Sequence, residues 1–386
     1  MNYSDNFKIY KFIIFLFIYI IMISINNIKD KNDFQDLNNK YFNPCKTVGH
    51  YNSKFDNNTE LSNSEIINDL RRGAECHKLV RKQLQTYIRP GMKIYDICTF
   101  IEKSIVKNFN QNDLQAGIGF PVSYATNNVL AHDTAVNNDT RTLHFNDVVK
   151  IDYGTHVNGR IIDSAFTLAF NPKYKPLLDA TKQATYEAIK MAGPETYVND
   201  ISKHIDEVIE SYEIELDGKV YPIKTVGDVG GHNIRPYQIH GGTMILCKPS
   251  KSNLVNIMRL KEGECYAFET FASTGTGNFL SDDENNNLFC LKANAKNTKK
   301  VFTYDITNKV FDYIKTTRST LPFCSRWLDD KFGSDYKIAT DELYKNNIIN
   351  TYPPLYDIKN SYTSQLEHTV YIHSYGKEVV SYCEDY

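Results

Sequence analysis

The sequence predicts an α+β fold, in which amphipathic helices pack on β-sheets within one large core. Two patterns in the 386-residue chain lead to this prediction. In some segments apolar residues recur at three- and four-residue steps, and in others β-branched runs lie between Gly and Asn turns. Hydrophobic residues make up 41% and charged residues 23%, which excludes a wholly disordered chain and a polytopic membrane protein.

Charge and cysteine content narrow the class of protein further. The formal net charge of −2 provides no global basic field, so we expect no specific nucleic-acid partner. The eight cysteines are scattered and include no CxxC pair. This pattern argues against a zinc ribbon or a disulfide scaffold and favours a reducing compartment.

The N-terminal region precedes the predicted core. Residues 12–25 read FIIFLFIYIIMISI, a basic-flanked apolar run shorter than the about 20 residues of a membrane span. Three interpretations stay open: a signal peptide, an uncleaved anchor that would associate with a membrane, or an artefact if translation begins at Met22. Residues 26–64 are rich in Asn, Asp, Lys and Ser without an apolar period, which predicts a disordered linker.

The core is expected over residues 65–386. Its first helix has one apolar face and ends at Pro90-Gly91; the face comprises Ile66, Ile67, Leu70, Ala74, Val80, Leu84 and Tyr87. Further elements follow in order: a helix at 94–106, strands and turns at 116–170, helices at 175–192 and 198–212, strands and turns to 273, a largely helical segment at 286–351, and a strand pair at 363–380.

The segment VVKIDYGTHVNGRIIDSAFTLAF is the most informative part of the chain. Asn158-Gly159 between two β-branched runs predicts a hairpin with a type I′ turn. If Val157 pairs with Arg160, then Asp152 and Asp163 are diagonal neighbours on one face, roughly 5–8 Å apart.

Two carboxylates on one face of apolar strands need a compensating cation. Arg160 or Lys150 could form a structural ion pair, but Lys150 points away from the turn and only Arg160 lies near. We therefore favour a divalent metal. His156 shares this face near the turn, and we expect it to be exposed at the surface.

Three more residues are candidate ligands. His232 follows two glycines in VGGHNI, Glu269 lies in the apolar run ECYAFETFAST, and Glu367 lies in SYTSQLEHTVYIH. Taken alone, the histidine could be solvated and either glutamate could face outward from an edge strand. Together, four carboxylates and one imidazole fit two divalent cations, and Mn, Fe, Co and Zn all suit such ligands.

These residues lie in motifs that resemble those of methionine aminopeptidases of the type 2 class, members of the pita-bread (creatinase/aminopeptidase) fold family. The resemblance covers residues 65–386; its motifs are GIGFPVSYATNNVLAH, KIDYGTH, GRIIDSAFT, GGHNI, YQIHGG, FETFAST, YPPLYDIKNSYTSQLEHT and the terminal EDY. It implies two pseudo-symmetric sheet halves with flanking helices. The helical insertion 286–351 is the feature that distinguishes type 2 from type 1.

The resemblance also implies a dinuclear metal centre. In the family pattern Asp152 binds one metal, Asp163 and Glu367 bridge both, and His232 and Glu269 complete the other. The reaction implied is removal of the N-terminal methionine from nascent proteins and peptides when the second residue is small, by attack of a metal-bridged hydroxide.

In the same resemblance His132 and His240 match two histidines that contact the substrate, and we propose a role for each in the reaction. Glu269 would be the general base, His132 would hydrogen-bond the scissile amide, and His240 would stabilise the oxyanion. Phe120, Ile239 and Tyr352 match the pocket for the methionine side chain.

Two departures from the family pattern limit what is transferred. Gly230 stands where the family usually has Asn. Pro322 stands where it has a small residue such as Ala, a change in the expected pocket wall, and for this reason we do not transfer inhibitor sensitivity. The charged N-terminal extension of eukaryotic members is absent, which leaves contact with the ribosome open. We expect a cytoplasmic monomer that acts on nascent polypeptide N-termini, with a membrane-anchored or secretory location as the alternative if residues 12–25 are a real signal or anchor.

Two alternative functions are compatible with this fold. Proline-specific aminopeptidases and dipeptidases use similar metal sites but generally carry a separate N-terminal domain, whereas only a predicted linker precedes this core. A non-catalytic pita-bread binding protein is the second alternative. The presence of suitable residues at all five ligand positions, and of both histidines, argues against it.

Overall fold

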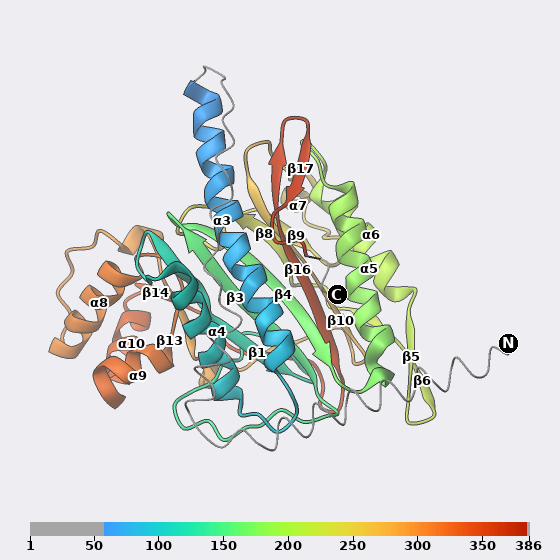
Figure 1. The fold of residues 1–386 in the computed structure, drawn as a ribbon, viewed down its shortest axis with the longest axis horizontal. Coiled ribbons are helices and arrows are strands. Elements are labelled where there is room, and N and C mark those ends of the chain that lie inside the picture. The colour runs from blue at the N-terminus through green and yellow to red at the C-terminus, as the bar shows by residue number, and fades with distance from the viewer. Residues whose placement is uncertain (1–57, 384–386) are drawn as a thin grey trace, which may run out of the picture. The chain divides into compact units, whose positions relative to one another are not determined.

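The computed structural model describes residues 58–383, with side chains described from residue 64 onward. Two antiparallel half-sheets, each covered by two helices, form the main core, and a smaller module lies beside them (Figure 1). The apolar segment 12–25 and most of the expected linker lie outside the described residues. No helix within the described part of the chain is long and apolar enough to cross a membrane.

The first half-sheet has the strand order β1-β3-β4 and packs against helices α3 and α4. Their bounds are β1 Ala116–Thr126, β3 Val148–Val157, β4 Arg160–Ala169, α3 Asn58–Tyr87 and α4 Ile94–Phe109. The apolar face expected for α3 is confirmed, since Leu70, Ala74, Val80 and Leu84 are buried. Helix α3 begins at Asn58, so residues 58–64 are helical although we expected them in the linker. Asn, Thr and Ser suit a first turn without giving an apolar period.

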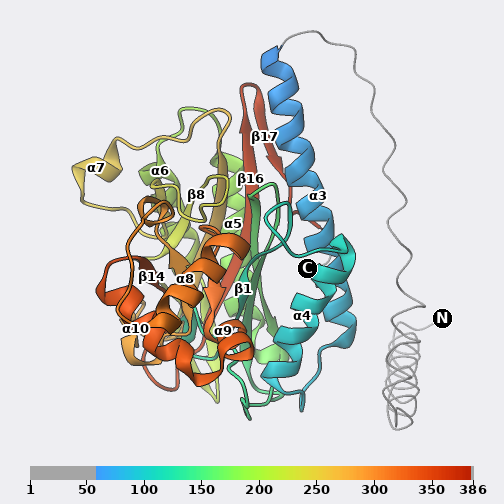
Figure 2. The same ribbon diagram turned by 90° about the vertical axis from the view of Figure 1, so that its left-hand side faces the viewer.

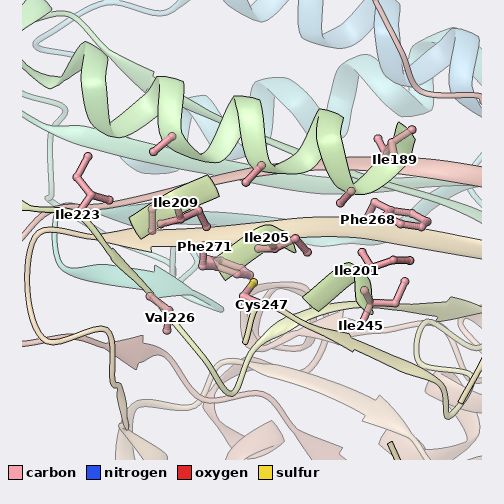
Figure 3. Close-up of a cluster of buried hydrophobic side chains, with 14 of the residues drawn as sticks. Ile189, Ile201, Ile205, Ile209, Ile223, Val226, Ile245, Cys247, Phe268 and Phe271 are labelled. Carbon is pink, nitrogen blue, oxygen red and sulfur yellow. The ribbon is translucent and has the colours of Figure 1, made fainter. Parts of the chain in front are cut away.

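The second half-sheet has the order β17-β16-β10-β8-β9, with β7 also paired to β10. Its strands are β7 Lys224–Thr225, β8 Gly230–Ile234, β9 Met244–Leu246, β10 Cys265–Ser273, β16 Thr363–His373 and β17 Gly376–Val379. Helices α5 (Lys175–Met191) and α6 (Val198–Glu210) cover it. Figure 3 shows isoleucines of α6 packed against Phe268 and Phe271 of β10. These bounds agree with the expected helices to within two residues.

The Asn158-Gly159 hairpin forms as expected. Both turn residues have positive φ, 50° for Asn158 and 75° for Gly159, as a type I′ turn requires. A Cβ atom on Gly159 would lie 2.3 Å from the ring of Tyr237, so the turn is also closely covered by another loop.

The segment 286–351 forms a module that differs from the expectation. It contains three helices, α8 Asp305–Thr317, α9 Ser325–Phe332 and α10 Tyr336–Lys345, which lie together in Figure 2. It also contains a small sheet of order β13-β12-β14, built from Phe323–Cys324, Leu288–Leu291 and Ile349–Thr351. Strands of two to four residues are too short to show a period, so the sequence pattern missed them. We call this segment the insertion module.

The remaining elements are short. They are β2 Val129–Ala131, β5 Glu213–Leu216, β6 Lys219–Pro222, α7 Asn253–Asn256, β11 Leu280–Ser281, β15 Leu355–Tyr356, and the 3-10 turns Pro172–Tyr174, Asp283–Asn285, Ala293–Ala295 and Gly333–Asp335. Strand β15 pairs with both β2 and β11.

Candidate metal centre

The hairpin places two carboxyls on one face of the first half-sheet. Asp152 on β3 lies opposite Ala165, and Asp163 on β4 lies opposite Gly154. This is the register that the turn predicts, and it makes the two aspartates diagonal neighbours.

The second half-sheet presents three further candidate ligands. Glu269 on β10 lies directly opposite Glu367 on β16, and His232 on β8 lies opposite Ala267. Directly opposed residues share a face and so do residues two apart along a strand. The imidazole and both carboxyls therefore lie on one face of this half-sheet.

Side-chain hydroxyls join the two half-sheets where β4 meets β16. Thr369 Oγ1 accepts a hydrogen bond from the Asp163 N–H (2.8 Å) and donates one to the Asp163 carbonyl (2.6 Å). Ser164 Oγ donates to the Glu367 carbonyl (2.8 Å). As a result, Asp163, His232 and Glu367 each offer a ligand atom within 4.8 Å of the others.

Every residue expected at the site lines one cavity of about 190 Å³. These residues are Phe120, His132, Asp152, Asp163, His232, Ile239, His240, Glu269, Tyr352 and Glu367. Much of the remaining wall is apolar and includes Met244, Phe271, Leu288 and Pro322. The chain thus forms an apolar cavity with a cluster of carboxyls.

No lysine or arginine is among the described residues that line this cavity. Arg160 instead pairs with Asp69, with Nη1 3.0 Å from Oδ2. Lys150 is buried, and its Nζ donates to the Asn127 carbonyl at 2.9 Å. Neither of the two cations considered from the sequence compensates the aspartates, so the structural ion pair is ruled out.

The four carboxyls carry strongly perturbed pKa values. Burial raises the pKa of Asp152 to about 7. Burial, followed by repulsion from neighbouring carboxyls, raises the pKa of Asp163, Glu269 and Glu367 well above the usual range. A bound cation would favour the ionised carboxylates at neutral pH.

The donor atoms fit a divalent metal. Asp152 Oδ1 and Glu367 Oε2 are buried without a hydrogen-bond partner. His232 Nε2 lies 3.6 Å from Asp163 Oδ2 and 3.9 Å from Glu269 Oε1, too far for hydrogen bonds. Burial lowers the pKa of His232, which keeps the imidazole in its neutral, ligating form. Oxygen donors with one imidazole suit Mn, Fe, Co or Zn.

Two further histidines and a tyrosine line the cavity beside this cluster. The His240 ring lies 4.3 Å from the His232 ring, and Tyr352 Oη lies 3.5 Å from His240 Nδ1. Burial lowers the pKa of His132 and His240 to about 4, so both are neutral at pH 7. His132 has a φ of 65°, an unusual backbone conformation that is common at functional sites.

His156 lies outside the cavity, and the expectation that it is exposed was wrong. Its side chain is fully buried, and its Nδ1 accepts a hydrogen bond from the Gly159 N–H (3.3 Å). The reason is tertiary: Tyr237 donates from its N–H to the Gly159 carbonyl (2.7 Å), so another loop covers the turn.

The sequence interpretation missed Gln365 and Asp228. Gln365 Nε2 donates to Glu269 Oε2 (3.0 Å) and thereby orients that carboxyl. Its position two residues before Glu367 puts it on the same strand face, which is the signal that could have identified it. Asp228 also lines the cavity, but nothing in the surrounding sequence distinguishes it.

Comparison with known proteins agrees with this geometry. Residues 68–287 match the model of metallopeptidase family M24. The chain is 44% identical over 321 residues to methionine aminopeptidase 2 of Debaryomyces hansenii, a match that covers 82% of this chain and 74% of the relative.

Two solved structures share the fold at low identity. A thermophilic Arx1 aligns with a TM-score of 0.69 and 16% identity, over 83% of this chain and 92% of that chain. Methionine aminopeptidase from Rickettsia prowazekii aligns with a TM-score of 0.56 and 15% identity, over 83% of this chain and 98% of that chain. The expected pita-bread fold is confirmed, and the chain belongs to metallopeptidase family M24 and, within it, to the methionine aminopeptidase 2 family.

Proposed function

We propose that this protein is a metal-dependent aminopeptidase that removes the N-terminal methionine from nascent proteins and peptides whose second residue is small. The observation that carries the proposal is the convergence of four carboxyls and one imidazole in an apolar cavity without a lysine or arginine among its described lining residues. Membership of the methionine aminopeptidase 2 family supports the same reaction.

The proposed centre holds two divalent ions, because four carboxylates and two such ions cancel in formal charge. Asp152 would bind one ion, His232 and Glu269 the other, and Asp163 and Glu367 both. When bound, such ions supply Lewis acidity and a nucleophile at neutral pH.

Glu269 is the proposed general base. Its Oε2 accepts a hydrogen bond from Gln365, which restricts rotation of the carboxyl. Its Oε1 faces His232 Nε2 at 3.9 Å. A carboxylate held in this way can take up the proton released during attack on the first peptide bond.

His132 and His240 are proposed to bind the reacting amide. A neutral imidazole donates one hydrogen bond, which suits contact with an amide oxygen or a developing oxyanion. His132 would hydrogen-bond the scissile amide and His240 the oxyanion. The Tyr352 hydroxyl, 3.5 Å from His240 Nδ1, would orient the latter ring.

Selectivity for methionine is proposed to come from the apolar wall that contains Phe120, Ile239 and Tyr352. A pocket that discriminates by shape rejects a side chain one methylene different by only about 10–200-fold. A norleucine side chain has nearly the length and shape of methionine, so we expect some turnover of norleucine-like N-terminal residues.

Release of methionine from Met-Ala-Ser tests this function directly. The full chain would be treated with a chelator and then resupplied with Mn, Fe, Co or Zn, with Xaa-Pro-Ala peptides assayed in parallel. We expect metal-dependent release of methionine alone. Release from the Xaa-Pro peptides instead would transfer the protein to the proline-specific branch, and no release with any metal would favour a non-catalytic binding protein.

Cellular context is part of the same proposal. Nascent polypeptide N-termini are the proposed partners. A cytoplasmic location, contact with the ribosome and a monomeric state stay predictions, which cell fractionation, ribosome co-sedimentation and analytical ultracentrifugation would test.

A further inference from the structure

We propose that Arg318 is a positioning residue that sets the width of the cavity between Phe120 and Pro322 and so determines which N-terminal side chains are accepted. This inference rests on the proposed function, in which the cavity receives the methionine side chain. Arg318 does not line the cavity itself.

Arg318 reaches from the insertion module into the main core. It is the residue that follows α8, and only 6% of it is exposed. Its Nη2 donates to the carbonyls of Ile118 (2.9 Å), Gly119 (3.2 Å) and Pro322 (3.0 Å). A single nitrogen therefore contacts backbone from two separate parts of the fold.

The backbone that it holds in β1 is irregular. The pairing of β1 with β3 shifts register between Ile118 and Phe120, and shifts again after Phe120. The hydrogen bonds between β1 and β3 are therefore interrupted around Phe120. The hydrogen bonds from Arg318 hold the backbone just before Phe120 instead.

On its other side, the ring of Phe120 lies directly against the backbone of β3. It lies opposite Gly154, and a Cβ atom there would be 2.2 Å from the Phe120 ring. Phe120 is thus held between the glycine and the segment bound by Arg318. Because Pro322 is bound by the same guanidinium nitrogen, the separation of the two walls depends on Arg318.

The charge of Arg318 has no carboxylate partner within ion-pair distance among the described residues. It is balanced by carbonyl dipoles and by the face of Trp327, whose ring centre lies 5.1 Å from Cζ. Burial lowers its pKa to about 10, so it stays protonated at neutral pH.

Arg326, eight residues further along the chain, is a buried arginine with a purely structural ion pair. Arg326 also joins the insertion module to the main core, but through a bidentate bond to Glu102 with distances of 2.8 and 2.7 Å. It does not line the cavity, and its hydrogen bonds go to Glu102 and the Ala135 carbonyl rather than to the backbone beside Phe120 or to Pro322, so it is a control for burial, charge and location.

The test compares Arg318→Gln and Arg318→Lys with Arg326→Lys. Each metal-loaded full-length variant would be assayed for kcat/KM on Met-Ala-Ser and on the analogue with ethionine, whose side chain is one methylene longer. Binding of free L-methionine and L-ethionine would be measured in parallel, so that selectivity is known without turnover. The melting temperature of each variant reports its folding, independently of the contact between Arg318 and Trp327.

We expect Arg318→Gln to lower the methionine-to-ethionine ratio at least about five-fold, in both kcat/KM and binding. Arg318→Lys should fall between this variant and wild type, because an ammonium retains three donors. Arg326→Lys should lower the melting temperature and leave both ratios unchanged.

Three results would overturn the inference: unchanged ratios in both Arg318 variants, an equal loss of selectivity in Arg326→Lys, or no difference between the Lys and Gln replacements. If Arg318→Gln does not fold, the ratio in Arg318→Lys decides. If wild type releases no methionine, the proposed function fails on that result, whereas the binding ratios still decide the role of Arg318.

Discussion

The two half-sheets deliver carboxyls to the same cavity by different routes. In the first, Asp152 and Asp163 belong to one hairpin closed by a two-residue turn. In the second, Glu269 and Glu367 are 98 residues apart in the sequence, yet lie directly opposite each other on paired strands. The first arrangement follows from local turn chemistry, and the second exists only when the whole core is folded.

Removing a proposed bridging ligand from either half should have the largest effect. Asp163→Asn and Glu367→Gln should each lower kcat/KM for Met-Ala-Ser by more than about 100-fold, because even groups that only orient metal ligands cost 10–100-fold. Without metal, both variants should melt at a higher temperature than wild type, since each removes one of several mutually repelling buried carboxyls. Activity within ten-fold of wild type in either variant would contradict the metal centre.

Weakening the join between the halves should have the next largest effect. Thr369→Val removes both hydrogen bonds to the Asp163 backbone at nearly constant shape. We expect a loss of about 10–100-fold in metal affinity and of about 1–3 kcal/mol in the free energy of unfolding. Metal titration and urea denaturation would measure the two effects.

The matched control is Thr316→Val on the exposed face of α8, where the hydroxyl bonds only to carbonyls of its own helix. This change should leave metal affinity unaltered. Equal losses in the two variants would mean that the β4–β16 contact does not position the ligands.

A substitution in the β3–β4 turn tests the contribution of local turn geometry by itself. Gly159→Ala introduces a side chain at a φ of 75° and within 2.3 Å of Tyr237, which should cost about 1–3 kcal/mol of unfolding free energy. Gly218→Ala, in the β5–β6 turn, has a similar φ of 78° but open space around it, so its loss should be smaller. Urea denaturation compares them, and identical losses would show that only backbone conformation matters.

The smallest effect expected is a pH dependence within the first half. His77 on α3 is buried and its Nε2 lies 2.9 Å from the Tyr153 carbonyl and 3.2 Å from that of Ser164. Burial, and then the charge of Arg81, lower its pKa well below 6.5. Below pH 6.5, His77 is therefore protonated in the unfolded chain but stays neutral in the folded chain. The free energy of unfolding is unaffected by His77 above pH 6.5 and declines as the pH falls below that value.

The slope from His77 is at most about 1.4 kcal/mol per pH unit. Unfolding free energies of metal-loaded wild type and His77→Gln at pH 7.0 and 5.5 would measure it, and the variant should lose less. His144→Gln changes a histidine whose side chain is 72% exposed and should match wild type. A parallel decline in His77→Gln and wild type would exclude His77 as the cause.

Local sequence patterns predicted those structures that form between residues close together in the chain. The apolar face of α3 and the register of the β3–β4 hairpin follow from spacing and from Asn158-Gly159 alone. The insertion module shows where such patterns end. Its helices were expected, but Leu288–Leu291 and its partner strands are defined by pairing with distant residues rather than by a period.

The candidate site divides in the same way. The five candidate ligands and their order were apparent from motifs, whereas the two aspartates meet the other three where the hydroxyls of Thr369 and Ser164 join β4 to β16. Tertiary packing also decided the burial of His156 and the reach of Arg318 into β1. The sequence by itself determined which groups each strand presents on a face, because side-chain direction alternates along a strand. Only the tertiary structure decided which faces meet, because that depends on contacts between segments far apart in the chain.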